Sequence, residues 1–356
     1  MRILHSADWH LDAPMSGHSE EKSQLLRSQL RKIPELIVRL CQAERCDLLL
    51  LSGDLFDGAP SKECVATVKA ALEKVKIPVV ISPGNHDFCA GSSPYLTEDW
   101  PENVHIFTKP AVESFALPEL GCRIYGAGYD SMDCPGLLKD FQTCGDEKWH
   151  IGVFHAEADT ASSHYCPIPK TQIRDSGLHY LALGHIHKAS SLRVGDTLCA
   201  WPGCPMGKGF DELGPKGVIL VQLEDSVSAG FVPLDVPRFF DEEVEVSGDP
   251  TDAVAAILPA METPDYYRIT LTGYCEGVDC AQIQKAFPHV SNLTVLDETL
   301  PEMDLWSALG SDNLEGVYFS ILHNATQSDS QTVARRAKLA AQLSRKILDG
   351  QEVKLP

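Results

Sequence analysis

The chain has 356 residues and a formal net charge of −20 at pH 7, and 44% of its residues are hydrophobic and 22% charged. This length and composition suit a globular protein of two domains, and no stretch is long and apolar enough to predict a membrane span. The amino-terminal stretch lacks the basic and apolar regions of a secretion signal, so we expect a cytoplasmic protein without membrane association. The acidity excludes the broad basic surface of most nucleic-acid-binding domains. Such a chain binds phosphates only through local positive charge, metal ions or a partner.

The first two thirds of the chain alternate helices with strands and then become rich in strands, which predicts an α/β sandwich with a mixed sheet. Residues 21–45 have apolar side chains at helical spacing, and Pro34 divides them into one kinked helix or two short ones. A helix over 61–74 begins at an N-cap serine. Residues 88–119 and 158–170 are expected to be irregular. The predicted strands cover residues 1–7, 48–51, 77–81, 122–126, 150–154, 178–183, 198–200 and 218–223.

A domain boundary is predicted near residues 236–241, where prolines flank a change of pattern. We expect a first domain over 1–236, a small α+β domain over 237–325 and a C-terminal helix within 326–356. The cations of that helix are more simply explained by a solvated face than by contact with nucleic acid. The second domain is predicted to have a β-α-β-α-β order over residues 242–247, 252–258, 266–272, 279–287 and 293–296.

Five of the predicted strands are followed by polar side chains of the kinds that bind metals. Carboxyl ends of strands meet at one edge of an α/β sheet, so we expect these side chains to converge. Carboxylate, imidazole and amide groups suit Mn²⁺, Fe²⁺ or Zn²⁺, and so many ligands suit two ions rather than one tetrahedral site. Each alone is equally or better explained as a hydrogen-bonded loop, core or helix-capping residue, but the combination favours a metal centre. The candidates are Asp8, His10, Asp54, Asn85, His155, His185 and His187.

Together these motifs resemble the calcineurin-like metallophosphoesterases over roughly residues 1–225. Within that superfamily, residues 8–12, 52–57 and 201–217 resemble the SbcD and YhaO branch of DNA repair nucleases. The resemblance implies a sandwich of two mixed β-sheets flanked by helices, followed by a smaller α+β capping domain. The matching motifs are Asp8-x-His10, Gly53-Asp54-x-x-Asp57, Gly84-Asn85-His86-Asp87, His155 and Gly184-His185-x-His187.

The resemblance also implies a role for each ligand. Two divalent ions, most simply Mn²⁺, share one bridging carboxylate, Asp54, and activate a water molecule for in-line attack on phosphorus. One ion would be held by Asp8, His10, Asp54 and His187, and the other by Asp54, Asn85, His155 and His185.

Further roles follow from the same resemblance. The catalytic residue His86 would contact the phosphate and assist the leaving oxygen. Asp57 and Asp87 would form the second shell that orients the ligands, although Asp57 could equally cap a helix. His18 could be the extra histidine that nucleases of this branch carry after the first motif.

The favoured function is that of a Mn²⁺-dependent DNA exonuclease or endonuclease. The resemblance further implies that the protein forms a homodimer and works with an SMC-like ATPase of the SbcC or YhaN type. That partner would supply the DNA affinity that the acidic chain lacks. The alternative is a phosphodiesterase for a small molecule such as a cyclic nucleotide or nucleotide-sugar, which the acidity favours. A non-catalytic scaffold is disfavoured by the intact ligand set.

Overall fold

The computed structural model describes residues 1–15, 19–160, 162–275, 277–300 and 305–350, so His18 lies outside the described residues. The chain divides into two compact units. The first comprises Met1–Asp241 together with Pro264–Tyr267, and the second comprises Glu242–Thr263 and the residues from Arg268 onward. Among the described residues, no helix combines the length and the apolar character needed to cross a membrane.

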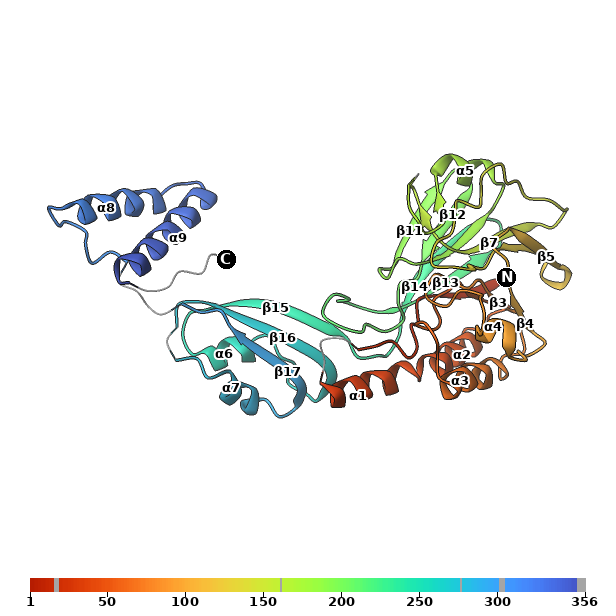
Figure 1. Cartoon of the computed structure of the whole chain (residues 1–356), viewed down its shortest axis with the longest axis horizontal. Coiled ribbons are helices and arrows are strands. Elements are labelled where there is room, and N and C mark those ends of the chain that lie inside the picture. Colours follow the sequence, from red (N-terminus) through yellow and green to blue (C-terminus); the bar gives the residue numbers. More distant parts are fainter. Residues whose placement is uncertain (16–18, 161, 276, 301–304, 351–356) are drawn as a thin grey trace. The chain divides into compact units, whose positions relative to one another are not determined.

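The first unit contains two six-stranded mixed sheets (Figure 1). The first sheet has the order β14-β13-β1-β2-β3-β4, in which β1 to β4 are parallel and β13 and β14 are antiparallel to their neighbours. Its strands are β1 (Arg2–Ser6), β2 (Leu48–Leu51), β3 (Val79–Ile81), β4 (Val104–Ile106), β13 (Gly217–Leu223) and β14 (Val227–Pro233).

The second sheet has the order β11-β12-β10-β7-β6-β5, with four parallel central strands and antiparallel edges. Its strands are β5 (Glu113–Leu117), β6 (Cys122–Gly126), β7 (Trp149–His155), β10 (Tyr180–Gly184), β11 (Ser190–Val194) and β12 (Thr197–Trp201).

Alternating side chains of β2 explain how the layers pack. Leu49 and Leu51 lie in a core cluster with the helices, whereas Leu48 and Leu50 lie in a cluster that the two sheets share. A third cluster, which includes Phe154, covers the other face of the second sheet. A strand buried on both faces reads as a continuous apolar run, as 48–51 does. The sandwich of two mixed sheets flanked by helices is therefore confirmed.

The first three helices of the first unit begin near the positions that the sequence signals predict. The segment 21–45 forms two helices, α1 (Glu20–Leu30) and α2 (Ile33–Ala43), and Pro34 lies in the first turn of α2, where its missing N–H costs no hydrogen bond. Helix α3 (Lys62–Leu72) begins after Ser61, whose hydroxyl accepts a hydrogen bond from the amide of Cys64 at 3.2 Å.

The prediction that 88–119 and 158–170 are irregular was wrong. These segments contain α4 (Pro94–Thr97), β4, β5, a 3₁₀ turn (Pro118–Leu120), most of the pair β8 (Glu157–Ala158) and β9 (Pro167–Ile168), and the start of α5 (Lys170–Asp175). The strands β11 and β14 were not predicted either. All these strands are short or lie at edges, and β4 and β11 are largely half-buried or exposed, so they lack the apolar pattern that marks central strands.

The second unit contains a three-stranded sheet, β15-β16-β17, and a pair of helices. The sequence predicted the order of its sheet and first helices, but not α8. Its elements are β15 (Phe239–Val246), α6 (Pro250–Ala255), β16 (Thr263–Gly273), α7 (Cys280–Ala286), β17 (Val290–Asp297), α8 (Leu314–Thr326) and α9 (Gln331–Leu348), of which β15 and β16 also extend into the first unit.

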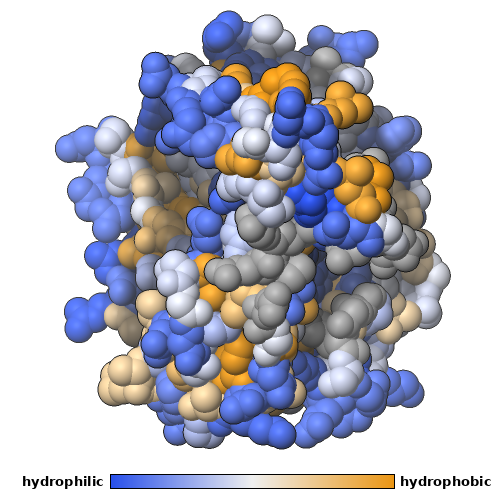
Figure 2. Space-filling view, turned by 90° about the vertical axis from the view of Figure 1, so that its left-hand side faces the viewer, coloured by the Kyte–Doolittle hydropathy of each residue, from blue (hydrophilic) through white to orange (hydrophobic). Residues whose placement is uncertain are grey.

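Hydrophobic residues are exposed in patches among hydrophilic ones on the face drawn in Figure 2. In α8, Leu314, Val317, Tyr318 and Ile321 are 85%, 57%, 42% and 62% exposed. Their spacing of three and four residues places them on one face of the helix. We call these four residues the α8 stripe. The α8 stripe is as apolar as a helix face that packs in a core, but its side chains are exposed.

A polar chain crosses the core between the two sheets. His5 of β1 is fully buried, and its Nδ1 lies 2.8 Å from the Tyr180 hydroxyl of β10. Its Nε2 lies 2.7 Å from the hydroxyl of Ser52, directly after β2. Burial lowers the pKa of His5 to about 3, so the ring is neutral and both nitrogens depend on these partners.

Tyr180→Phe leaves one nitrogen of His5 buried without its partner. We expect the free energy of unfolding to fall by about 1–3 kcal/mol, measured by urea denaturation. Tyr129→Phe is the matched control, because the Tyr129 hydroxyl is buried without a hydrogen-bond partner among the described residues. Its removal should be neutral or stabilising. Equal losses in both variants would contradict the proposed link between the sheets.

Candidate metal centre

Four loops and one strand end carry the predicted ligands, all at the carboxyl ends of strands, and both sheets contribute. The first sheet supplies the loops after β1, β2 and β3, and the second supplies the end of β7 and the loop after β10. In that order these segments carry Asp8 and His10, Asp54, Asn85, His155, and His185 with His187.

The loops after β1 and β2 are held side by side by backbone hydrogen bonds. The amide of Asp8 donates to the Gly53 carbonyl at 3.0 Å, and the amide of His10 donates to the Asp54 carbonyl at 2.9 Å. Asp8, His10 and Asp54 have φ angles of 54°, 47° and 51°. This left-handed region costs non-glycine residues of order 1–3 kcal/mol each, and such residues cluster at functional sites.

The glycines of the motifs are explained by close packing around the donors. Gly53 has φ of +90°, and a Cβ there would lie 2.6 Å from Nδ1 of His155 and 2.8 Å from the amide of Gly84. A Cβ on Gly84 would lie 2.7 Å from Cγ of His155 and would collide with the Asp54 carboxylate. Only glycine therefore lets the three loops approach this closely.

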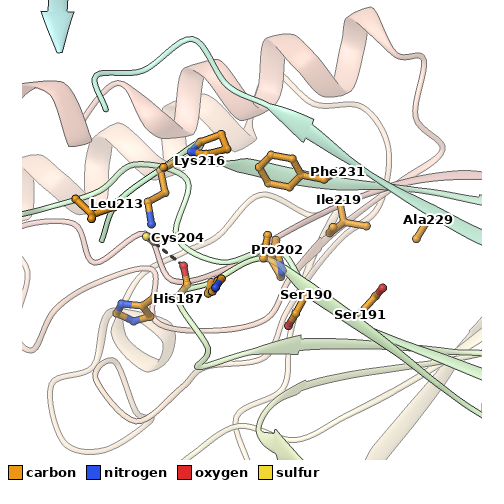
Figure 3. A pocket seen from close by; sticks show the side chains of 14 residues that line it. His187, Ser190, Ser191, Pro202, Cys204, Leu213, Lys216, Ile219, Ala229 and Phe231 are labelled. Atoms are coloured by element: carbon orange, nitrogen blue, oxygen red, sulfur yellow. Dashed lines mark hydrogen bonds between the residues drawn. The ribbon is translucent and has the colours of Figure 1, made fainter. Parts of the chain in front are cut away.

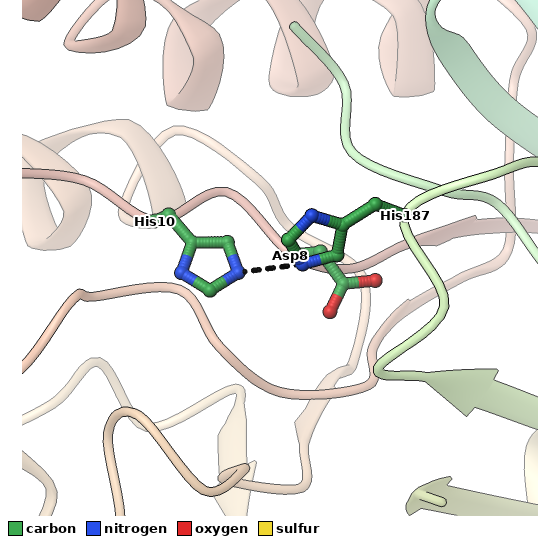
Figure 4. Close-up of side chains that lie close together, drawn as sticks. All are labelled: Asp8, His10 and His187. Atoms are coloured by element: carbon green, nitrogen blue, oxygen red, sulfur yellow. Dashed lines mark hydrogen bonds between the residues drawn. The ribbon is translucent and has the colours of Figure 1, made fainter. Parts of the chain in front are cut away.

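One group of donors joins Asp8, His10 and His187 across the two sheets (Figure 4). The ring nitrogens Nε2 of His10 and Nε2 of His187 are 3.0 Å apart. Oδ2 of Asp8 and Nδ1 of His10 are buried without hydrogen-bond partners among the described residues. Buried polar atoms rarely lack a partner unless an ion or ordered water supplies one. The group therefore fits a cation.

A second group joins Asp54, His155 and Asp8. Nε2 of His155 lies 3.2 Å from Oδ2 of Asp54 and 3.0 Å from the Asn85 side-chain oxygen, while Nδ1 of His155 is held by the Ser52 carbonyl at 2.9 Å. Burial disfavours charge on both partners, but their attraction outweighs it, so the pKa of Asp54 is lowered and the pKa of His155 is raised to about 9. The pocket between them thus stabilises positive charge.

Asp54 also belongs to a third group of donors, with His10 and His86, so it lies between His10 and His155, as a bridging ligand would. Its Oδ2 lies 3.7 Å from Nε2 of His10, and its Oδ1 accepts a hydrogen bond from the His86 amide at 2.9 Å. The alternative that Asp54 or Asp57 caps the next helix was wrong, because Ser61 is the N-cap of α3.

His185 does not join these groups of donors. Its Nε2 lies 3.0 Å from Oε1 of Glu157, and its amide donates to Oδ1 of Asp8 at 2.9 Å. The centres of the His185 and His155 rings are 5.3 Å apart. Its other ring nitrogen, Nδ1, makes no hydrogen bond with the described residues, so this is the atom that could reach a cation beside His155.

Asp57 and Asp87 orient the neighbouring groups. Oδ1 of Asp57 lies 2.5 Å from Nδ1 of His86, which leaves Nε2 of this partly exposed ring without a hydrogen-bond partner among the described residues. Asp87 accepts hydrogen bonds from the amides of Asp54 and Leu55 at 3.2 and 2.7 Å, and from the Tyr95 hydroxyl. Asp87 therefore holds the Asp54 loop in its left-handed conformation.

Glu212 is a residue of the site that the sequence did not single out. Its Oε1 lies 2.6 Å from Nδ1 of His187, so Nε2 of His187 faces the donors. Burial disfavours its charge, but the hydrogen bond to His187 and the charge of Lys208 outweigh burial and lower the pKa of Glu212 to about 2. The only sequence signal was its place in the 201–217 stretch, where no pattern separates Glu212 from Asp211.

The model of the calcineurin-like phosphoesterase family matches residues 1–189, which is more than half of the chain. The chain belongs to the calcineurin-like phosphoesterase family. All seven predicted ligands lie within the matched residues. This family uses divalent metals in a dinuclear site, and the buried unpartnered atom of Asp8 and the pocket beside Asp54 fit such a site.

Relatives at modest identity support the SbcD and YhaO branch of this family. YhaO of Bacillus subtilis, an uncharacterized metallophosphoesterase, is 32% identical in an alignment of length 240 that covers 63% of this chain and only 57% of that protein. The SbcD component of the nuclease SbcCD from Staphylococcus epidermidis is 24% identical over 332 residues, 83% of this chain and 85% of that protein. A dimetal phosphatase from Danio rerio aligns in structure with a TM-score of 0.43 and 13% identity, over 65% of this chain and 95% of that one.

Glu212→Gln keeps the size of the side chain but removes the charge that orients His187. We expect the affinity for Mn²⁺ to fall by about 10–100-fold, measured by calorimetric titration of the metal-free protein. Asp211→Asn is the control, because Asp211 is exposed and adjacent in sequence. Equal affinities in both variants would show that Glu212 does not orient the ligand.

The hydrogen bond to Asp57 raises the pKa of His86 above its ordinary value of 6.5. This pair therefore stabilises the metal-free fold below about pH 6.5, and the contribution is lost as pH rises through the raised pKa. In Asp57→Asn we expect the NMR titration midpoint of His86 to move to lower pH. An unchanged midpoint would contradict the assigned partner.

Proposed function

We propose that this chain is a Mn²⁺-dependent nuclease that hydrolyses phosphodiester bonds of DNA, as an exonuclease or endonuclease in DNA repair. The observation that carries the proposal is the long match to the SbcD component of nuclease SbcCD. It covers 83% of this chain, so it extends beyond the family region at residues 1–189 and into the second unit. We infer that the second unit serves as the capping domain of such a nuclease.

In this proposal both cations share Asp54, which lies in one group of donors with His10 and in another with His155. When bound, the two cations would polarise the phosphoryl oxygens and supply a nucleophile from water near neutral pH. Mn²⁺ suits a mixture of carboxylate, amide and imidazole, with Fe²⁺ or Zn²⁺ as the other candidates. One cation would be held by Asp8, His10, Asp54 and His187, and the other by Asp54, Asn85, His155 and His185.

His86 is the proposed proton donor to the leaving oxygen. Its side chain is 41% exposed, so a substrate can reach it, unlike the buried ligands. Asp57 binds Nδ1 and directs Nε2 away from itself, and the hydrogen bond to Asp57 raises the pKa of His86, which favours the protonated ring that a proton donor needs. His185 would offer Nδ1 to the second cation, because Glu157 binds its Nε2.

A chain this acidic needs a partner in order to bind DNA. We infer that the partner is an SMC-like ATPase of the SbcC or YhaN type, which would bind a homodimer of this chain in the cytoplasm. Two observations support a partner. The net charge of −20 opposes strong binding to phosphates by the chain alone. The α8 stripe exposes four apolar residues in helical register, as a docking helix does.

The test is cleavage by the purified full-length chain with Mn²⁺, on single- and double-stranded DNA and on bis-p-nitrophenyl phosphate. We expect hydrolysis of DNA, alone or with an ATPase partner, and its loss on chelation. Hydrolysis of the small diester without any DNA cleavage would instead support a small-molecule phosphodiesterase, which the acidity of the chain favours.

The substitution His86→Ala tests whether His86 is a proton donor rather than a metal ligand. We expect kcat to fall by about 10²–10⁴-fold while the bound metal stays close to the wild-type amount, measured by elemental analysis. His289→Ala is the control, because His289 contacts a backbone carbonyl of the second unit. Loss of metal in His86→Ala would contradict its role.

A further inference from the structure

A cavity of about 480 Å³ opens beside His187 in the first unit (Figure 3). Its size falls within the range of small-ligand sites, about 300–1,000 Å³. His187 lines its wall, so the cavity adjoins the metal centre without containing its other ligands. The cavity therefore lies where the part of a substrate next to the reacting phosphate would extend.

One end of the cavity carries a buried lysine. Lys216 is only 7% exposed, and it makes no ion pair or side-chain hydrogen bond with the described residues. Figure 3 shows its ammonium group on the side of Cys204 and His187. The ammonium group of this largely buried side chain reaches the cavity and has no anion within hydrogen-bond distance among the described residues, so it is placed to bind an anion that enters the cavity.

The residues that line the cavity carry positive charge, unlike the chain as a whole. Lys188 is exposed at the rim, and none of the described residues that line the cavity is acidic. The whole chain nevertheless carries a net charge of −20. Local positive charge is the feature that an acidic chain needs in order to hold a phosphate.

The other end of the cavity is apolar. Ile219 of β13 and Phe231 of β14 lie there with Ala229, and Pro202 lies in the middle (Figure 3). Phe231 is 37% exposed, so part of its side chain is accessible to a ligand in the cavity. Aromatic side chains in such positions stack on nucleobases without regard to which base is present.

We propose that this cavity binds the nucleotide that flanks the scissile phosphate, with its phosphate at Lys216 and its base against Phe231. The inference rests on the proposed nuclease function and names a substrate contact outside the metal centre. The ammonium group of Lys216 can bind a phosphate, and the apolar wall with Phe231 can bind a base, so the two together are complementary to a nucleotide. Inorganic phosphate would contact Lys216 alone.

The test measures inhibition of bis-p-nitrophenyl phosphate hydrolysis by the full-length chain with Mn²⁺. The inhibitors are deoxyadenosine 5′- and 3′-monophosphate and, for comparison, inorganic phosphate. We expect at least one nucleotide to inhibit about tenfold more strongly than phosphate, and Phe231→Ala to abolish this difference. Equal inhibition by all three, or a difference that survives Phe231→Ala, would overturn the proposal.

Lys216→Met should raise KM for a single-stranded oligonucleotide about tenfold more than it raises KM for the small diester. It should also reduce the slope of log KM against log salt by about 0.7, the loss of one phosphate contact. Lys216→Arg keeps the charge and should restore most of the effect. Lys139→Met, at an exposed position outside the cavity, is the control. An equal rise for both substrates would overturn the role of Lys216.

The two proposals fail in different ways. Absence of DNA cleavage together with nucleotide inhibition that depends on Phe231 would reject the nuclease and keep the nucleotide site. DNA cleavage with no effect of Phe231→Ala or Lys216→Met would keep the nuclease and reject this site.

Discussion

The pairing of the loops after β1 and β2 is the constraint on which the site depends. Hydrogen bonds from the amides of Asp8 and His10 to the Gly53 and Asp54 carbonyls hold left-handed backbone on both loops. The carboxylate of Asp87 accepts hydrogen bonds from the amides of Asp54 and Leu55 and so fixes the loop after β2. The strained conformations are therefore determined by the backbone around them, and the donors are oriented before any cation arrives.

The sequence predicted that the donor side chains would converge because each one lies within a few residues of the end of an apolar run. A buried strand such as 48–51 is recognisable by itself, and the residue after it must lie at the edge of the sheet. The structure brings Asp8, His10, Asp54, Asn85, His155 and His187 within reach of one another and places His185 beside them on Glu157. The ranges of the central strands were predicted for the same reason.

Other parts could not be predicted, because their signal depends on distant neighbours. Glu157 lies in the two-residue strand β8 and Glu212 lies in a loop, both in segments without periodicity, and only the folded chain shows that each binds a histidine of the site. Lys216 precedes β13 as one cation among many, and its burial arises from tertiary packing. Edge strands such as β4 and β11 are half-buried or exposed, so they carry little of the apolar alternation that central strands show.

The division of the donors between the two sheets has a thermodynamic consequence. Asp8, His10, Asp54 and Asn85 follow strands of the first sheet, whereas His155, His185 and His187 belong to the second. Any cation coordinated by both sets acts as a cross-link between the halves of the sandwich. Ligand that binds only the native state shifts the folding equilibrium by mass action, so the melting temperature of this unit is coupled to the concentration of free divalent cation.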